Sequence, residues 1–152
     1  MNRVYNISGK QATCSTSDKT ALTLISSANG RPAINEFGVG AAGTPADNAL
    51  VYLLQRFTAV GTAGASVTPQ ARNPSDNWTP DATAGENHSS EPTYTSAAIL
   101  FRIALNQKAT LLWQALPGNE LWLPATANNG VGVRASSPAY TSEFNANVAF
   151  VD

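Results

Sequence analysis

The sequence predicts an all-β protein: a single-domain antiparallel β-sandwich of jelly-roll-like form, with one long Pro-rich loop. The chain has 152 residues, which is a common size for one domain. Short apolar runs are separated by Gly, Pro and Asn, and they lack the 3.6-residue period of helices. Roughly eight or nine runs have the length of strands, the number expected of a two-sheet sandwich or jelly roll. A small closed barrel is the alternative.

The expected strands follow one another along the chain, and most alternate apolar and polar residues as half-buried strands do. They cover residues 4–7, 20–25, 33–39, 49–58, 98–105, 109–115, 120–123, 131–134 and 144–150. The run ALVYLLQRFT at 49–58 is apolar on both faces, which favours a central buried strand over the alternative of a short helix. Asn106 and Gln107 form a connection of hairpin length, so 98–105 and 109–115 are expected to pair with each other.

The segment 1–19 is rich in Ser, Thr and Asn, and residues 20–152 form the expected sandwich domain. The segment is predicted to be a flexible N-terminal arm that orders on binding, with a frayed terminus plus one added edge strand as the alternative. Its start has no apolar signal-peptide core, and no run of about 18 apolar residues occurs in the chain. Neither a signal peptide nor a membrane span is therefore expected.

Residues 69–96 are predicted to form the long loop, since four prolines interrupt any strand pattern there. Trp78 and Tyr94 are large apolar groups with a polar tip, so they are candidate anchors into a neighbouring subunit. In the alternative, the loop folds back over its own sandwich and Trp78 caps the core. The candidate protein-interface residues are Trp78, Tyr94, His88, Pro80, Tyr140 and Tyr5.

Charge is scarce in this chain and close to balanced. Charged residues make up 12%, about half the usual share. A surface of small neutral side chains loses little on desolvation and suits lasting contact with other proteins. The formal net charge is -1, so the chain has no excess of basic residues that would bind phosphates or an anionic membrane. Nucleic acid and membrane are therefore not expected as partners.

The residues that most often carry chemistry are sparse. His88 is the single histidine and lies between Glu86 and Glu91, yet a catalytic zinc site normally takes three protein ligands. Cys14 is the single cysteine, which excludes an intrachain disulfide, and a nucleophilic role requires His88 to come close to it. We expect no enzyme activity, metal or cofactor, and a solvated or interface position for His88.

Exposed aromatic residues offer a function of another class, a platform for sugars. Trp78, Trp113 and Trp122 are the candidates. Trp113 and Trp122 lie inside strand patterns, so they are expected in the core because an indole buries a large area. A sugar site therefore depends mainly on Trp78, with Tyr94 and Tyr140 as companions.

Two glycine pairs resemble phosphate-binding loops only superficially. Gly38-Val39-Gly40 and Gly130-Val131-Gly132 neither open a predicted helix nor continue to Lys-Ser/Thr. These glycines are therefore expected to serve turns and close packing.

Most of the chain beyond residue 20 resembles small virion proteins of tailed bacteriophages. The resemblance covers residues 20–68 and 83–134 and the closing strand, and its most specific parts are TPADNALVYLLQRFTAVGT at 44–62 and ATANNGVGVR at 125–134. It implies a head-stabilising protein of the decoration or cement kind. Such proteins bind the outside of the lattice of the major capsid protein, commonly as homotrimers.

The resemblance assigns no catalytic residue and no binding motif to this chain. It implies a protein made in the host bacterial cytoplasm and located on the capsid surface of the virion. The alternative is a carbohydrate- or receptor-binding head or fibre module, because the same low charge, β-rich pattern and aromatic-bearing loop are expected of such a module.

Overall fold

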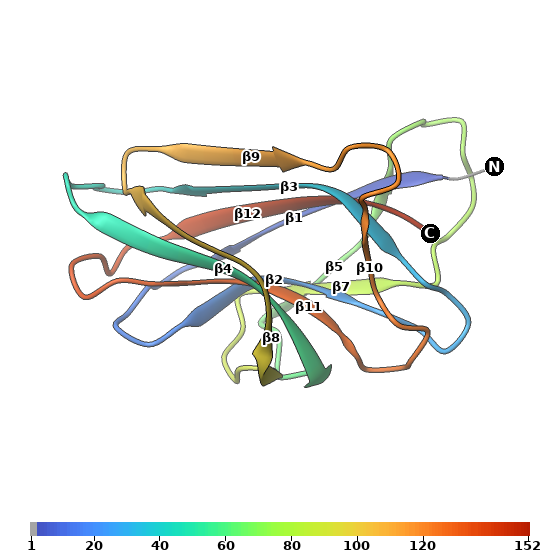
Figure 1. The fold of residues 1–152 in the computed structure, drawn as a ribbon, viewed down its shortest axis with the longest axis horizontal. Coiled ribbons are helices and arrows are strands. Elements are labelled where there is room, and N and C mark those ends of the chain that lie inside the picture. Colours follow the sequence, from blue (N-terminus) through green and yellow to red (C-terminus); the bar gives the residue numbers. More distant parts are fainter. Residues whose placement is uncertain (1–2) are drawn as a thin grey trace.

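A computed structural model describes residues 3–152 and confirms the predicted all-β sandwich (Figure 1). Two antiparallel sheets pack face to face, and the described residues contain no α-helix. The twelve strands are β1 (Val4–Gln11), β2 (Lys19–Ile25), β3 (Ala33–Ala41), β4 (Ala49–Ala59), β5 (Ala65–Val67), β6 (Gln70–Ala71), β7 (Thr83–Glu86), β8 (Thr93–Asn106), β9 (Thr110–Gln114), β10 (Leu121–Trp122), β11 (Gly130–Ser136) and β12 (Phe144–Val151).

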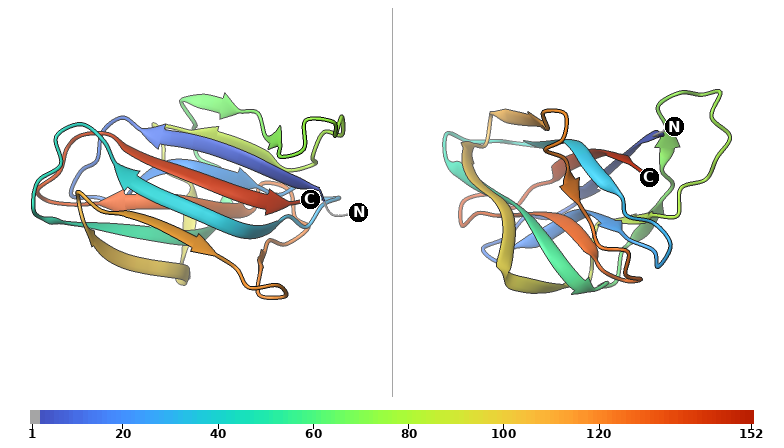
Figure 2. Two further views of the ribbon diagram at one scale, coloured as in Figure 1. Left: turned by 90° about the horizontal axis from the view of Figure 1, so that it is seen from above. Right: turned by 45° about the vertical axis from the view of Figure 1, so that its right-hand side comes forward.

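The strands are divided between two sheets that we call sheet A and sheet B. Sheet A has the order β10-β3-β12-β1-β6, with β9 also paired to β3. Sheet B has the order β5-β7-β2-β11-β4-β8. The first and last long strands, β1 and β12, pair along eight residues in the interior of sheet A, which brings the two chain ends to one end of the molecule (Figures 1 and 2).

The core lies between the sheets and follows the two-residue period of strands. In β12, the side chains of Phe144 and Phe150 are fully buried, whereas Asn145 on the other face is exposed. Strand β4 lies between β11 and β8, which confirms the central strand predicted for 49–58. The largest fully buried apolar side chains come from both sheets: Tyr5, Phe57, Phe144, Phe150, Ile7, Leu22, Leu24, Ile34, Leu50, Leu54 and Leu123.

The predicted hairpin between 98–105 and 109–115 is wrong. Strand β8 pairs with β4 in sheet B, whereas β9 pairs with β3 in sheet A. The connection between them passes from one sheet to the other, and Gln107 binds it to the loop that precedes β4. The Gln107 backbone N–H donates to the Asn48 carbonyl at 2.9 Å, and its side-chain Oε1 accepts from the Ala46 backbone amide at 2.9 Å. A short connection is therefore used here as a corner between the two layers.

About half of the described N-terminal segment is a paired strand, β1, which is closer to the alternative of an added strand than to a flexible arm. Strand β1 pairs with β12 throughout, and β6 pairs with its first part. Beyond β6, the Lys10 amide donates to Glu86 Oε2 at 2.9 Å, so side chains from the end of β7 cover the remaining edge. Residues 1 and 2 of the predicted arm lie outside the described residues.

The predicted loop 69–96 is shorter in the structure. Strands β6 and β7 and the beginning of β8 all lie within this range, and β7 pairs with both β2 and β5. The longest part outside the strands is 72–82, which projects from one end of the sandwich (Figure 2). Pro74 and Pro80 prevent regular strand pairing in 72–82. The segment Thr83–Glu86 contains no proline, so its backbone can pair with neighbouring strands.

Phe150 provides a test of the predicted core. Its ring has no exposed surface and stacks on Tyr5 with ring centroids 5.6 Å apart. We expect Phe150→Ala to lower the free energy of unfolding by about 3 to 5 kcal/mol, because it leaves a cavity between the sheets. Leu116→Ala, at a side chain that is 72% exposed, should change it by less than about 0.5 kcal/mol. Urea denaturation measures both, and equal effects would contradict this packing.

Candidate interaction surfaces

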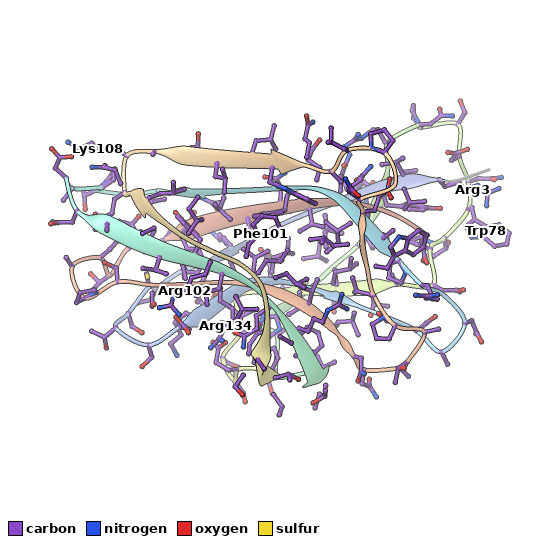
Figure 3. The ribbon with its side chains drawn as sticks, viewed as in Figure 1. Arg3, Trp78, Phe101, Arg102, Lys108 and Arg134 are labelled. Atoms are coloured by element: carbon purple, nitrogen blue, oxygen red, sulfur yellow. The ribbon has the colours of Figure 1, made fainter. Side chains whose placement is uncertain are left out.

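A pocket of about 890 Å³ lies beneath the loop 72–82 and brings together three of the predicted interface residues. Tyr5 lies at the beginning of β1, whereas Trp78 and Pro80 come from the loop itself. Small side chains from β5 and β7, such as Ala84, complete the wall. The Trp78 side chain projects beyond the sandwich at the end where Arg3 lies (Figure 3).

Trp78 is exposed and held in place from its backbone. The Tyr5 hydroxyl donates to the Trp78 carbonyl at 3.2 Å, and the Tyr5 ring is fixed in the core against Phe150. The guanidinium of Arg3 lies over the indole, 4.8 Å from its centroid. Trp78 nevertheless stays 59% exposed, so it does not cap the core as the alternative expectation has it.

The outer face of sheet A carries a shallow groove of about 570 Å³, which sequence reasoning missed. Gly38 and Gly40 of β3 lie inside this strand and not in a turn, and the side chains of Asn147 and Thr110 lie over them. Asn145 and Asn147 of β12 flank one side, and Thr110 of β9 lines the groove as well. The alternation of small and amide residues in both strands is the signal from which this groove can be predicted.

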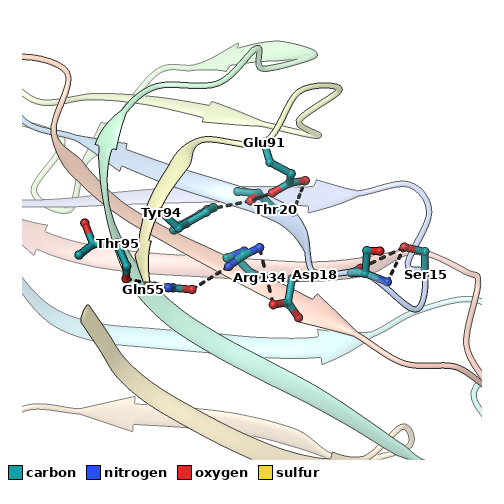
Figure 4. A network of polar contacts seen from close by, with 9 residues as sticks. Ser15, Asp18, Thr20, Gln55, Glu91, Tyr94, Thr95 and Arg134 are labelled. Carbon is teal, nitrogen blue, oxygen red and sulfur yellow. Dashed lines mark hydrogen bonds and ion pairs between the residues drawn. The ribbon is translucent and has the colours of Figure 1, made fainter. Parts of the chain in front are cut away.

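The opposite layer carries a polar network around Tyr94 and Arg134 on sheet B (Figure 4). The Arg134 guanidinium lies 3.9 Å from the centroid of the Tyr94 ring, and its Nη1 donates to Gln55 Oε1 at 2.7 Å. Its Nη2 lies 3.6 Å from a carboxylate oxygen of Asp18. This pairing joins strands β4, β8 and β11 with the segment that leads into β2.

Glu91 and Thr20 extend the network to the other end of the Tyr94 side chain. The Thr20 amide donates to Glu91 Oε1 at 3.1 Å, its hydroxyl donates to Glu91 Oε2, and the Thr20 and Tyr94 hydroxyl oxygens are 2.7 Å apart. Burial raises the pKa of Tyr94, so the phenol stays protonated. Gly132 lies beneath the ring, where a Cβ would clash with the Tyr94 hydroxyl. A residue with a side chain at this position would therefore displace the ring.

Tyr94 is therefore a structural residue inside one protomer, not a free anchor for another. Tyr140 is buried, and its hydroxyl donates to the Ala42 and Glu143 carbonyls of its own chain. His88 is 3% exposed, which contradicts the expected solvated or interface position. Its Nε2 lies 3.4 Å from Thr23 Oγ1. Of the six interface candidates, Trp78 is exposed, Pro80 and Tyr94 are half-buried, and Tyr5, His88 and Tyr140 are buried.

The two other tryptophans differ in position from one another. Trp113 packs against Phe37 and Phe101 with ring centroids 5.4 and 5.0 Å away, close to the predicted core position. Trp122 is 48% exposed, so its predicted core position is wrong. The two-residue strand β10 lies at the border of sheet A, and the Arg31 guanidinium lies over the outward-facing indole of Trp122.

Strand β8 lies at the edge of sheet B, and β9 lies beside β3 at the edge of sheet A. Each pairs with one strand alone among residues 3–152, so each has an unpaired edge. Ile99 and Leu112 are exposed on these strands. Unpaired edges with few charges are places where another strand or chain can add.

The described residues offer no cluster suited to metal binding. Within 3–152, no group of three or more His, Cys, Asp or Glu side chains lies close enough to hold an ion. Cys14 is fully buried in the core, and burial raises the pKa of its thiol. In the same part of the chain, no helix is long and apolar enough to cross a membrane.

Tyr94 tests the role of the polar network in stability. We expect Tyr94→Ala to lower the free energy of unfolding by about 2 to 3 kcal/mol, because the ring supports both Arg134 and Phe57. Tyr94→Phe keeps the ring and removes only the hydroxyl beside Thr20, so it should cost about 1 kcal/mol. Urea denaturation separates the two, and a neutral Tyr94→Ala would contradict the assigned role.

His88 makes stability depend on pH. Burial lowers the pKa of His88, so the folded protein keeps the imidazole neutral at pH values where the unfolded chain, with a pKa of about 6.5, binds a proton. Its contribution is complete above about pH 6.5 and is lost as the pH falls through the folded value. We expect His88→Gln to lose less stability than wild type between about pH 7.5 and about pH 5.5 in urea titrations. An equal loss in both proteins would contradict this.

Comparison with known proteins adds no relative to this description. No protein-family model matches the chain, no curated protein matches it, and no solved structure matches it. The function is therefore inferred from the residues and geometry of the chain itself.

Proposed function

We propose that this chain is a structural virion protein that binds the outer surface of a bacteriophage capsid and stabilises it, as a decoration or cement protein does. The resemblance of residues 20–68 and 83–134 to small phage virion proteins supports this role. The observation that carries the proposal is the outer face of sheet A. There, glycine, threonine and asparagine side chains surround a shallow groove of about 570 Å³. In this role the chain catalyses no reaction.

The chemistry of this face suits contact with another folded protein. Asn145 and Asn147 present amides that both donate and accept hydrogen bonds, and Gly38 and Gly40 leave room for the Asn147 and Thr110 side chains that line the groove. Its charged lining residues are Lys10 and Glu86, which have opposite signs. Desolvating such a surface costs little, so the contact can be broad without a deep cavity.

The order of the strands supports the jelly-roll form of the sandwich. Neighbours run β1-β12-β3-β9 in sheet A and β2-β11-β4-β8 in sheet B. Apart from the short β5, β6, β7 and β10, successive strands alternate between the layers except at the β4–β8 step, where both lie in sheet B. Jelly rolls occur in viral capsid domains and in lectins, so the fold agrees with the proposal but does not decide it.

Self-association would let several weak contacts with the capsid act together, which raises the overall affinity for the shell. The unpaired edges of β8 and β9, with Ile99 and Leu112 exposed beside them, are the surface that we assign to contacts between copies. A homotrimer then presents three copies of the outer face of sheet A to the major capsid protein. Repeated contacts raise the overall affinity without requiring any single strong one.

The capsid contact is tested by placing a large charged side chain in the groove. Thr110 is an exposed groove residue, and Thr126 is an equally exposed threonine in the loop before β11. We expect Thr110→Arg to weaken cosedimentation with undecorated capsids of the encoding phage at least tenfold, or about 1.4 kcal/mol, because an arginine fills the space over Gly40. Thr126→Arg should bind like wild type.

Native mass of the purified protein is measured alongside. Saturation of the shells at a fixed ratio by a stable oligomer is the expected result. Failure of the wild-type protein to bind intact capsids would overturn the proposed function. Equal capsid binding by Thr110→Arg and Thr126→Arg would show that the capsid contact is not on sheet A.

A further inference from the structure

We propose that the pocket beneath residues 72–82 binds a neutral saccharide, a function separate from capsid binding. The pocket measures about 890 Å³, within the range that small-ligand sites occupy. It lies at the beginning of β1, at Tyr5, whereas the sheet A groove lies at the end of β1, from Ser8 to Lys10. The two surfaces are therefore distinct and can be tested by separate variants.

The charge of the lining selects a neutral ligand. Asp76 is the one charged side chain among the residues that line the pocket. No hydrogen bond or ion pair within residues 3–152 engages its carboxylate, which leaves both oxygens available as acceptors. Because the Arg3 guanidinium lies over Trp78, the site as a whole carries one charge of each sign, which favours a neutral ligand over an anion such as phosphate. The Asp76 carboxylate accepts hydrogen bonds well from hydroxyl groups.

The remaining lining combines an aromatic surface with scattered hydroxyl and amide groups. Trp78 supplies the aromatic surface and is 59% exposed even with Arg3 over its ring. The hydroxyls of Ser66 and Thr83 and the amide of Gln70 come from three different strands around the pocket. A pyranose ring has the matching chemistry, because its C–H face stacks on an indole while its rim of hydroxyls donates and accepts.

The site is built before any ligand arrives. Pro69, Pro74 and Pro80 line the pocket and limit the freedom of the loop that carries Trp78. The hydrogen bond from the Tyr5 hydroxyl to the Trp78 carbonyl ties this loop to a ring that is buried in the core. A loop that is ordered in advance loses less entropy on binding, which favours the weak ligands that saccharides commonly are.

The test begins with an array of neutral and acidic oligosaccharides probed with the whole chain, followed by calorimetric titration of the best neutral ligand. We expect binding to neutral glycans, reduced at least tenfold, or about 1.4 kcal/mol, by Trp78→Ala. Trp122→Ala is the matched control, since Trp122 is also exposed and also lies beside an arginine. It should bind like wild type, as should Thr110→Arg.

Asp76→Asn provides a second variant that keeps the size of the side chain, and it should weaken binding to the same neutral glycan. Circular dichroism establishes that each variant is folded. Absence of binding to every neutral glycan, preference for acidic glycans, or undiminished binding by folded Trp78→Ala would each overturn the proposal. Loss of capsid binding by Trp78→Ala, with no glycan bound by wild type, would instead assign the pocket to a protein partner.

Discussion

The burial of alternating apolar side chains between two sheets is the constraint on which the rest of this structure depends. The chain has one cysteine, and residues 3–152 contain no cluster of side chains that could hold a metal ion. The apolar core therefore supplies the stability that disulfides or metal ions give to other small domains. Strands β1 and β12 lie inside sheet A and place Tyr5 and Phe150 in the same core. Because the inner faces are committed to packing, binding is left to the outer faces, the edges and the loop.

Each outer surface owes its shape to a few residues on this rigid frame. On sheet A, Gly38 and Gly40 leave room for the side chains of Asn147 and Thr110, which line the groove. On sheet B, Gly132 makes room for the Tyr94 ring, and Arg134 covers that ring, so the corresponding space is filled. On both faces the glycines accommodate a neighbouring side chain, and on sheet A these side chains leave a shallow groove between them. This groove is why we assign the protein contact to sheet A.

The sequence predicts the long strands well because the two-residue period of side chains reports burial directly, as in β12 and in the doubly apolar β4. It fails where tertiary partners decide. The short strand β7 forms because β2 and β5 pair with it, and the corner after β8 depends on contacts that Gln107 makes with residues 46 and 48. Trp122 was misplaced because a two-residue border strand has no period to read.

The candidate sites follow the same division. The position of Trp78 in a Pro-rich segment predicts its exposure, whereas no local pattern shows that His88 and Tyr140 are buried by residues far along the chain.

Capsid binding through sheet A can be tested by electron cryomicroscopy of capsids carrying the protein. We predict density for a β-sandwich on the outside of the shell with the groove at Gly38 and Gly40 facing the major capsid protein. Density with that face turned to solvent, or shells without added density, would contradict it.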